Sequence, residues 1–304
     1  MRKANAEERS LLDPPAAEAH GGLSAPVVRP DGVAVRETAC KSILNTSSLG
    51  GYSLNCYTGC AHACAYCYAR FMQRFHPHPE AWGQFVDVKA NALEVLQRQL
   101  RRCRPGEVFV SSACDGWQPL EAERELTRQC CRLLLEHGFT VSALTKSALI
   151  LRDLDVLAEG DARVGVTLTA LDERLRELWE PGAGTVRERL RVLAEAHEAG
   201  LPTRVMCGPL LPFLSDSQQA IETMFAELGD RGVGWIWVDA LNPRPRVWEA
   251  VSDLLRRHFP GLLPRYRSLL FDPAAREAYV AGLHDRARAA AERLALTDRV
   301  AGCR

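Results

Sequence analysis

The stretch GCAHACAYCYAR, residues 59–70, carries three cysteines in the spacing C-x3-C-x2-C. They are Cys60, Cys64 and Cys67, and the aromatic Tyr66 directly precedes the last of them. A structural zinc site needs four ligands, usually from two close-set pairs of Cys or His, and the sequence holds no second C-x2-C or H-x3-H pair. Three thiolates can instead hold three irons of an iron–sulfur cube and leave the fourth iron open to a non-protein ligand. The spacing therefore favours an iron–sulfur cluster, with zinc as the alternative.

The other cysteines give no comparable pattern. The chain has 11 Cys, an odd number, so internal disulfides cannot pair them all. Residues 1–24 are charged and Ala-rich and contain no continuous apolar segment typical of a secretory signal, so we expect a reducing, cytoplasmic setting. Cys56 lies just before the motif, but its spacing to Cys64 does not fit the pattern, and we expect a structural role for it.

The charge balance limits the classes of partner. The 304 residues contain 38 Lys and Arg and 38 Asp and Glu, which argues against a protein held on nucleic acid by a dense basic surface. Residues 243–304 nevertheless hold 12 Lys and Arg against 7 Asp and Glu, so a local basic surface stays open. No apolar run approaches the roughly 18 residues that cross a bilayer, and we expect no membrane association.

Outward from the cysteines, short β-rich runs alternate with helical segments. The predicted strands are residues 51–55, 107–113, 139–145, 163–169, 202–208 and 234–241, and the predicted helices between them are residues 90–102, 122–137, 149–159, 185–199 and 217–228. Such alternation predicts βαβ units with right-handed crossovers and a parallel sheet. The number of strands falls two short of a full eight-stranded barrel. We therefore predict an α/β fold, a partial (βα)6 TIM-like barrel with a helical C-terminal extension.

Three regions follow from this pattern. Residues 1–35 are Pro-rich without a clear period and are predicted to be a flexible leader. Residues 36–242 form the predicted barrel core. Residues 243–304 form the predicted helical extension, with helices at residues 247–258, 264–270 and 274–296.

The cysteine motif and its flanks resemble the radical S-adenosylmethionine (SAM) superfamily. Within it, residues 41–75 and the segment WGQFVDVK, residues 82–89, resemble the spore photoproduct lyase-like branch, whose members are also described as DNA repair photolyase-related proteins. Cys56 stands where that branch usually has Pro. The resemblance extends over residues 41–241 and implies a full or partial TIM-like barrel with the cluster loop after the first strand, in agreement with the predicted strand order.

The resemblance implies a 4Fe-4S cluster on Cys60, Cys64 and Cys67 and S-adenosyl-L-methionine as the second cofactor. In the superfamily the open iron binds the amino and carboxylate groups of SAM, and one electron cleaves SAM to a 5′-deoxyadenosyl radical that abstracts hydrogen. An electron donor such as flavodoxin or ferredoxin is implied as a partner. The organic substrate is not identified, and nucleic acid, a nucleotide, a peptide and a small metabolite all stay open.

The resemblance also implies cofactor-binding roles at the carboxyl ends of the predicted strands, where barrel sites are built. The residues concerned are Tyr66, Asp115, Lys146, Thr167, Thr169, Glu180 and Arg189. Lys146 supplies a cation for the SAM carboxylate. Two alternatives stay open: Asp115 faces the SAM pocket or caps the next helix, and Arg189 contacts SAM or locks Glu180.

Cys114 is the scattered cysteine with the most specific implication, because a cysteine at this strand end returns hydrogen to the product in the lyase. The surrounding CDGWQPLE is closer to the TDPYQPLE form of the wider branch, so packing remains the alternative for Cys114. His76 and His78, in a Pro-rich loop, are expected at the surface. The function implied is a radical SAM enzyme. The alternatives are a DNA photoproduct lyase proper and a non-catalytic iron–sulfur or zinc protein.

Overall fold

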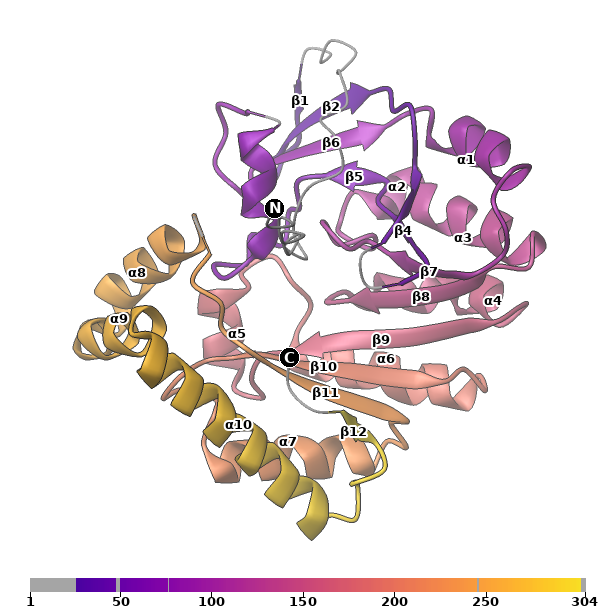
Figure 1. Cartoon of the computed structure of the whole chain (residues 1–304). Coiled ribbons are helices and arrows are strands. Elements are labelled where there is room, and N and C mark those ends of the chain that lie inside the picture. Colours follow the sequence, from indigo (N-terminus) through magenta and orange to yellow (C-terminus); the bar gives the residue numbers. More distant parts are fainter. Residues whose placement is uncertain (1–25, 48–49, 76, 245, 302–304) are drawn as a thin grey trace, which may run out of the picture.

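A computed structural model describes residues 26–47, 50–75, 77–244 and 246–301. Its larger sheet has the strand order β12-β11-β10-β9-β8-β7-β4-β3. The strands are β3 (Leu44–Thr46), β4 (Tyr52–Leu54), β7 (Glu107–Val110), β8 (Thr140–Thr145), β9 (Ala162–Leu168), β10 (Thr203–Leu210), β11 (Trp235–Ala240) and β12 (Val300–Ala301). From β4 to β12 every pair of neighbours is parallel, and only β3 pairs antiparallel, with β4. The six predicted strands and the partial barrel are thus confirmed (Figure 1).

The barrel strands are rich in β-branched residues that are buried, as expected for a parallel sheet covered by helices. Val108, Val141, Val164 and Val205 have no exposed surface. The crossover helices are α1 (Ala92–Leu100), α2 (Glu121–Arg124), α3 (Leu126–Glu136), α4 (Leu154–Leu157), α5 (Glu173–Trp179), α6 (Val186–Glu198) and α7 (Gln218–Gly229). The predicted helix 122–137 is divided at Glu125, whose φ is 49°, and α5 was not predicted.

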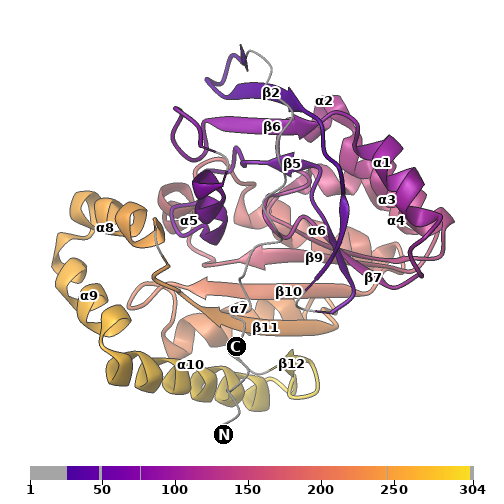
Figure 2. The ribbon, with the colours of Figure 1, turned by 45° about the horizontal axis from the view of Figure 1, so that its top comes forward.

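A second sheet was missed by the sequence reasoning. Its order is β1-β2-β6-β5, from β1 (Val27–Val28), β2 (Ala34–Thr38), β6 (Phe85–Lys89) and β5 (Tyr57–Thr58). It lies beside the open edge of the barrel, next to the loop that follows β5 (Figures 1 and 2). Residues 26–35 of the predicted leader therefore contribute β1 and the start of β2, and residues 1–25 lie outside the described part of the chain.

His78 contradicts the expectation of a surface loop. Its side chain is fully buried, stacks on Phe85 with ring centroids 3.8 Å apart, and places Nε2 3.0 Å from a carboxylate oxygen of Asp87 on β6. Its Nδ1 lies 3.9 Å from a carboxylate oxygen of Glu80. Burial of His78 could not be predicted from the loop alone, because Asp87 and Phe85 belong to β6 of the second sheet.

The C-terminal region consists of α8 (Val247–His258), α9 (Leu263–Phe271) and α10 (Pro273–Arg293), where three helices were predicted, followed by β12. Helix α10 packs along α7, and the chain then returns to pair β12 with β11. Side chains of α8 and α9 share one apolar cluster with Cys64, Tyr66 and Trp179. The extension therefore covers one side of the cysteine loop. Among the described helices, none is both long and apolar enough to cross a membrane.

Candidate functional site

The three motif cysteines lie on one loop between β5 and the 3₁₀ helix Tyr68–Arg74, at the carboxyl-end edge of the barrel. Cys60 and Cys64 are buried and Cys67 is half-buried. Burial raises the pKa of Cys60 well above its ordinary value, and the nearby Asp115 carboxylate and the Cys64 and Cys67 sulfurs raise it further. Burial also raises the pKa of Cys64 to about 12. Three thiols this close and this buried ionise when a metal supplies compensating charge, so the donor set fits a metal centre.

The described residues contain no group of three His, Cys, Asp or Glu arranged to hold a single metal ion. A mononuclear zinc requires its ligands to converge at bond distance on one ion. An iron–sulfur cube distributes its cysteines over separate irons and does not need such convergence. The residues present fit a cluster with three protein ligands.

The segment after α5 runs along the cysteine loop. The backbone amide of Ala65 donates to the Trp179 carbonyl oxygen at 2.8 Å, and the amide of Gly182 donates to the His62 carbonyl oxygen at 3.1 Å. A Cβ atom at Gly182 would collide with the Ala61 carbonyl oxygen. Only glycine permits this approach, which explains the EPG sequence at residues 180–182.

Glu180 and Arg189 form a fully buried ion pair behind the cysteine loop, each with 1% of its side chain exposed. Tyr66 donates its hydroxyl hydrogen to Glu180 and lies 2.9 Å from Thr169 Oγ1. Arg189 Nη1 also donates to the Thr167 carbonyl oxygen at 2.9 Å. Burial alone would raise the pKa of Glu180, but the positive charges of Arg189 and Lys146 hold it below its ordinary value. Of the two partners that the sequence left open for Arg189, SAM and Glu180, the structure pairs it with Glu180.

Lys146 follows β8 and faces the same loop. Its ammonium group lies 5.7 Å from the Tyr66 ring centroid, and its charge lowers the pKa values of Cys64 and Cys67 against the effect of their burial. It is not ion-paired with any carboxylate in the described ranges of the chain. Lys146 therefore presents a cation beside the cysteine sulfurs.

Asp115 is fully occupied by protein donors. Its Oδ1 accepts from the Trp117 amide at 2.9 Å and from Thr145 Oγ1 at 2.7 Å. Its Oδ2 accepts from the Lys146 amide at 2.8 Å and lies 3.3 Å from His62 Nδ1. Helix α2 begins at Glu121, so Asp115 does not cap it. Asp115 instead joins three chain segments around the site.

Cys114 lies between the cysteine loop and the barrel interior. Its sulfur is 3.7 Å from Asn55 Oδ1, and burial raises its pKa to about 12. Tyr68 was missed by the sequence reasoning, although it directly follows the last cysteine of the motif. The Tyr68 ring is exposed, but its hydroxyl donates to the Ser112 carbonyl oxygen. Removal of this hydroxyl from water raises the Tyr68 pKa, and the nearby Cys67 and Cys114 sulfurs raise it further. Tyr68 therefore stands beside both a cluster cysteine and Cys114.

Asp239 at the end of β11 was also missed. Burial raises its pKa to about 6, although Arg244 and Arg276 lie near enough to lower it. The Arg244 guanidinium is 6.0 Å from the centroid of the Tyr68 ring. A carboxylate and an arginine thus lie near Tyr68.

Replacing Asp239 with Asn is expected to stabilise the protein at pH 7.5 and to have no effect near pH 4. A carboxyl whose pKa is raised by folding contributes stability below its unfolded pKa and loses that contribution as pH rises through about 6. The gain at pH 7.5 is on the order of 3 kcal/mol in the free energy of unfolding, since a shift of one pKa unit corresponds to about 1.4 kcal/mol. Urea unfolding from pH 4 to 8 measures it, with exposed Asp298→Asn as the matched control. An equal gain at both pH values would contradict the assignment.

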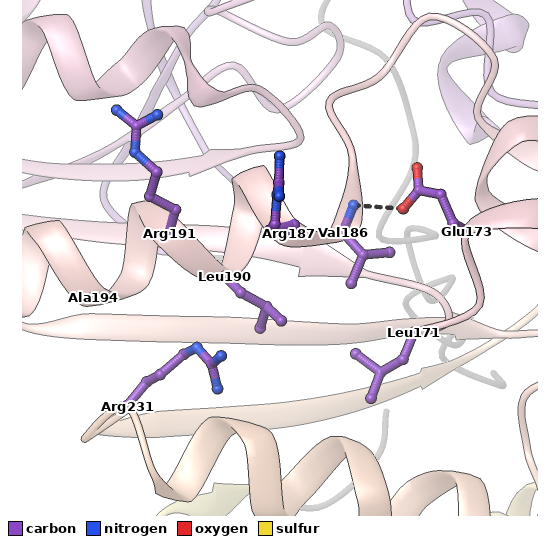
Figure 3. Close-up of a pocket in the computed structure, with 8 residues that line it drawn as sticks. All are labelled: Leu171, Glu173, Val186, Arg187, Leu190, Arg191, Ala194 and Arg231. Carbon is purple, nitrogen blue, oxygen red and sulfur yellow. Dashed lines mark hydrogen bonds between the residues drawn. The ribbon is translucent and has the colours of Figure 1, made fainter.

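A surface hollow of about 460 Å³ lies outside the barrel against α6 (Figure 3). It is lined by Leu171, Glu173, Val186, Arg187, Leu190, Arg191, Ala194 and Arg231. None of the motif cysteines lines it, and Arg191 and Arg231 are paired with Glu195 and Glu227. The hollow is separate from the cysteine site.

The fold and the site together define an α/β protein with a partial parallel barrel and a three-cysteine loop at its carboxyl-end edge. The chain belongs to the radical SAM superfamily, whose family model matches residues 54–224.

Two relatives with similar sequences are each named as an uncharacterised protein. A protein of Mycobacterium tuberculosis is 33% identical over 253 residues, which cover 79% of this chain and 74% of the relative. A protein of Methanocaldococcus jannaschii is 31% identical over 184 residues, 60% of this chain and 69% of the relative. The sequence therefore shows membership of the radical SAM superfamily, and the names of these relatives give no substrate.

The chain is also similar in structure to spore photoproduct lyase. A variant of that enzyme has a TM-score of 0.65 at 16% identity, over 89% of this chain and 82% of the lyase. The lyase complexed with dinucleoside spore photoproduct gives the same TM-score, identity and coverage. At this identity the likeness shows the fold alone.

Proposed function

We propose that the chain is an enzyme that binds a 4Fe-4S cluster through Cys60, Cys64 and Cys67 and SAM beside it, and that it removes hydrogen from an organic substrate. The observation that carries the proposal is that Cys60, Cys64 and Cys67 lie on one loop at the carboxyl-end edge of the barrel with the cation of Lys146 beside them, not ion-paired with any described carboxylate. When bound, the cluster and SAM together supply a carbon-centred radical that abstracts a hydrogen atom.

In this proposal, Lys146 contacts SAM, and the other side chains hold the cysteine loop in place. Lys146 supplies the positive charge for a SAM carboxylate next to the cluster. Glu180 joins Tyr66 and Arg189 behind the loop, since its carboxylate accepts the Tyr66 hydroxyl hydrogen and pairs with the Arg189 guanidinium. The helices α8 and α9 cover Cys64 and exclude water from that side. We assign Asp115 to positioning, since protein donors use both of its oxygens.

Anaerobic reconstitution with iron and sulfide, followed by reduction and addition of SAM, tests the proposal. We expect 5′-deoxyadenosine to form and methionine to be released. An intact cluster that leaves SAM uncleaved would instead indicate the non-catalytic iron–sulfur protein, and uptake of zinc alone would indicate a structural metal site. A reduced flavodoxin or ferredoxin, the partner we propose as electron donor, should replace the chemical reductant.

A second candidate is a DNA photoproduct lyase, and the position of Cys114 favours it. Cys114 lies close to Tyr68 and to the cysteine loop, where a thiol can return a hydrogen atom to a product radical. Transfer of the S–H hydrogen atom to a carbon radical breaks the S–H bond, forms a C–H bond and leaves the unpaired electron on the Cys114 sulfur. The nearby Tyr68 phenol can then give its O–H hydrogen atom to that sulfur, which restores the thiol and moves the unpaired electron to the phenol oxygen.

Cys114→Ala is expected to leave the cluster and SAM cleavage in place and to prevent clean repair of a dinucleotide spore photoproduct. The readouts are 5′-deoxyadenosine and the restored thymidine pair, with buried Cys207→Ala as the control. Unchanged repair by Cys114→Ala would remove the donor role. Failure of the wild type to repair the dinucleotide would leave the broader proposal, with another organic substrate.

A further inference from the structure

Three polar side chains of the segment DGWQPLE, residues 115–121, recur at every third position. The amide of Gln118 donates to the Asp115 carbonyl oxygen at 3.4 Å, and the amide of Glu121 donates to the Gln118 carbonyl oxygen at 2.9 Å. Two successive turns of this kind follow the 3₁₀ pattern, in which side chains three residues apart lie one above the other. Asp115, Gln118 and Glu121 therefore share one side of the segment, and that side meets the cysteine loop.

Gln118 holds the backbone on both sides of Cys60. Its Oε1 accepts from the Ala61 amide at 2.9 Å, and its Nε2 donates to the Gly59 carbonyl oxygen at 3.4 Å. The Gln118 side chain has no exposed surface, so water cannot replace these bonds. The two peptide groups that flank Cys60 are thus fixed by one amide side chain.

Asp115 contacts the cysteine loop at His62, the residue that follows Ala61. Its carboxylate lies 3.3 Å from Nδ1 of His62, which is 2% exposed and sits between Cys60 and Cys64 in the sequence. The same carboxylate accepts from Thr145 and from the Lys146 amide. It therefore links the cysteine loop to the end of β8, directly before Lys146.

Glu121 holds the start of the loop. Its Oε2 accepts from the hydroxyl of Tyr57 on β5, and its Oε1 accepts from the Arg128 amide at 3.0 Å. Glu121 has no exposed surface, and Tyr57 is 1% exposed. The start of the loop is thereby fastened to helix α3, one of the barrel's crossover helices.

We propose that residues 115–121 form a brace that sets the position of Cys60 for cluster binding. Its contacts fall on Tyr57, Ala61 and His62 and so enclose Cys60 from both sides. Asp115, Gln118 and Glu121 are positioning residues in this role, because none of them supplies a metal ligand. The inference rests on the proposed function only in that Cys60 binds the cluster. The hydrogen bonds from residues 115–121 to the cysteine loop exist in the protein without a cluster.

The experiment compares Gln118→Met with Gln99→Met, each of which keeps side-chain volume and removes the amide. Gln99 is the matched control, since its Oε1 accepts from the Ile43 and Leu44 amides at 2.9 and 3.0 Å, and its Nε2 donates to the Leu44 carbonyl oxygen at 2.8 Å. It thus braces a different segment with the same chemistry.

Two rates are measured. The first is alkylation of Cys60 in the metal-free protein, determined by mass spectrometry relative to Cys103 in the same molecule. The second is loss of iron from the reconstituted protein to a chelator. We expect Gln118→Met to raise both rates about tenfold or more, the factor that follows from losing two hydrogen bonds of ordinary strength. Gln99→Met should change both by less than about twofold.

Equal rates in the two variants would overturn the brace. If Gln118→Met fails to fold, Tyr57→Phe removes only the hydroxyl that reaches Glu121, and a rise of about threefold in Cys60 alkylation is expected; no rise would again overturn the proposal. If the wild type takes up no cluster, the proposed function fails, while the alkylation rate still decides whether the brace exists.

Discussion

Cys64→Ala is expected to abolish the visible absorbance of the reconstituted protein and to reduce 5′-deoxyadenosine formation to background. With two thiolates left, two irons of a cube would retain protein ligands, and a buried apolar pocket would face the third. Cys64 shares that pocket with Tyr66, Trp179 and the helices α8 and α9, and the nearby Glu180 carboxylate is already paired with Arg189. Iron content, absorbance and SAM cleavage measure the loss.

Cys56→Ala is the matched control. Cys56 is also buried and also lies near the loop, but its sulfur contacts that of Cys130 at 3.7 Å on the side of helix α3. The variant is expected to keep its iron and its SAM cleavage. Full iron in Cys64→Ala, or equal loss in Cys56→Ala, would contradict the ligand assignment from spacing.

The barrel could be predicted because its signals are local. Each parallel strand is a short β-branched run, and several helices end at a glycine such as Gly138 or Gly200, both with positive φ. The cluster cysteines were equally local, because all three lie on one short loop. The second sheet gave no such signal, because β1 and β5 have two residues each, too few to show a period. In the larger sheet, β12 was missed for a different reason: it has two residues and pairs with β11 only after α10 has returned the chain.

Side-chain roles were harder to predict wherever the partner is distant in sequence. Arg189 could be placed near Glu180 in the chain, but nothing in the sequence decides between SAM and Glu180 as its partner. Asp115 looked like a cofactor ligand or a helix cap, and its links to His62 and Thr145 depend on β7 and β8 being neighbours. Gln118 gave no signal at all, since a glutamine has no characteristic spacing with a backbone amide on another segment.

Arg189→Met is expected to lower the free energy of unfolding by about 3–5 kcal/mol, because it leaves the Glu180 carboxylate buried without a counter-charge. Removing both charges in Glu180→Gln/Arg189→Met should recover much of this loss, since no charge is then buried unpaired. Urea unfolding of the anaerobic protein measures the free energies. Arg191→Met, two positions along the same helix, removes an exposed pair with Glu195 and should change stability little.

The pH dependence of stability distinguishes an Arg189 that holds Glu180 from an Arg189 that contacts SAM. Arg189 and Lys146 hold the pKa of Glu180 below its ordinary value, so the pair stabilises the fold above the unfolded pKa of a glutamate and loses this contribution as pH falls through the folded pKa. In Arg189→Met the main positive charge is gone and burial raises the Glu180 pKa, so the variant should regain stability relative to the wild type on acidification. If Arg189 only pairs with Glu180, Arg189→Met should lower the stability of the fold, while the affinity of the folded variant for SAM stays close to that of the wild type. A direct SAM contact predicts the reverse, a large loss of SAM affinity with stability nearly unchanged, because the carboxylate of SAM rather than Glu180 would then lose its counter-charge.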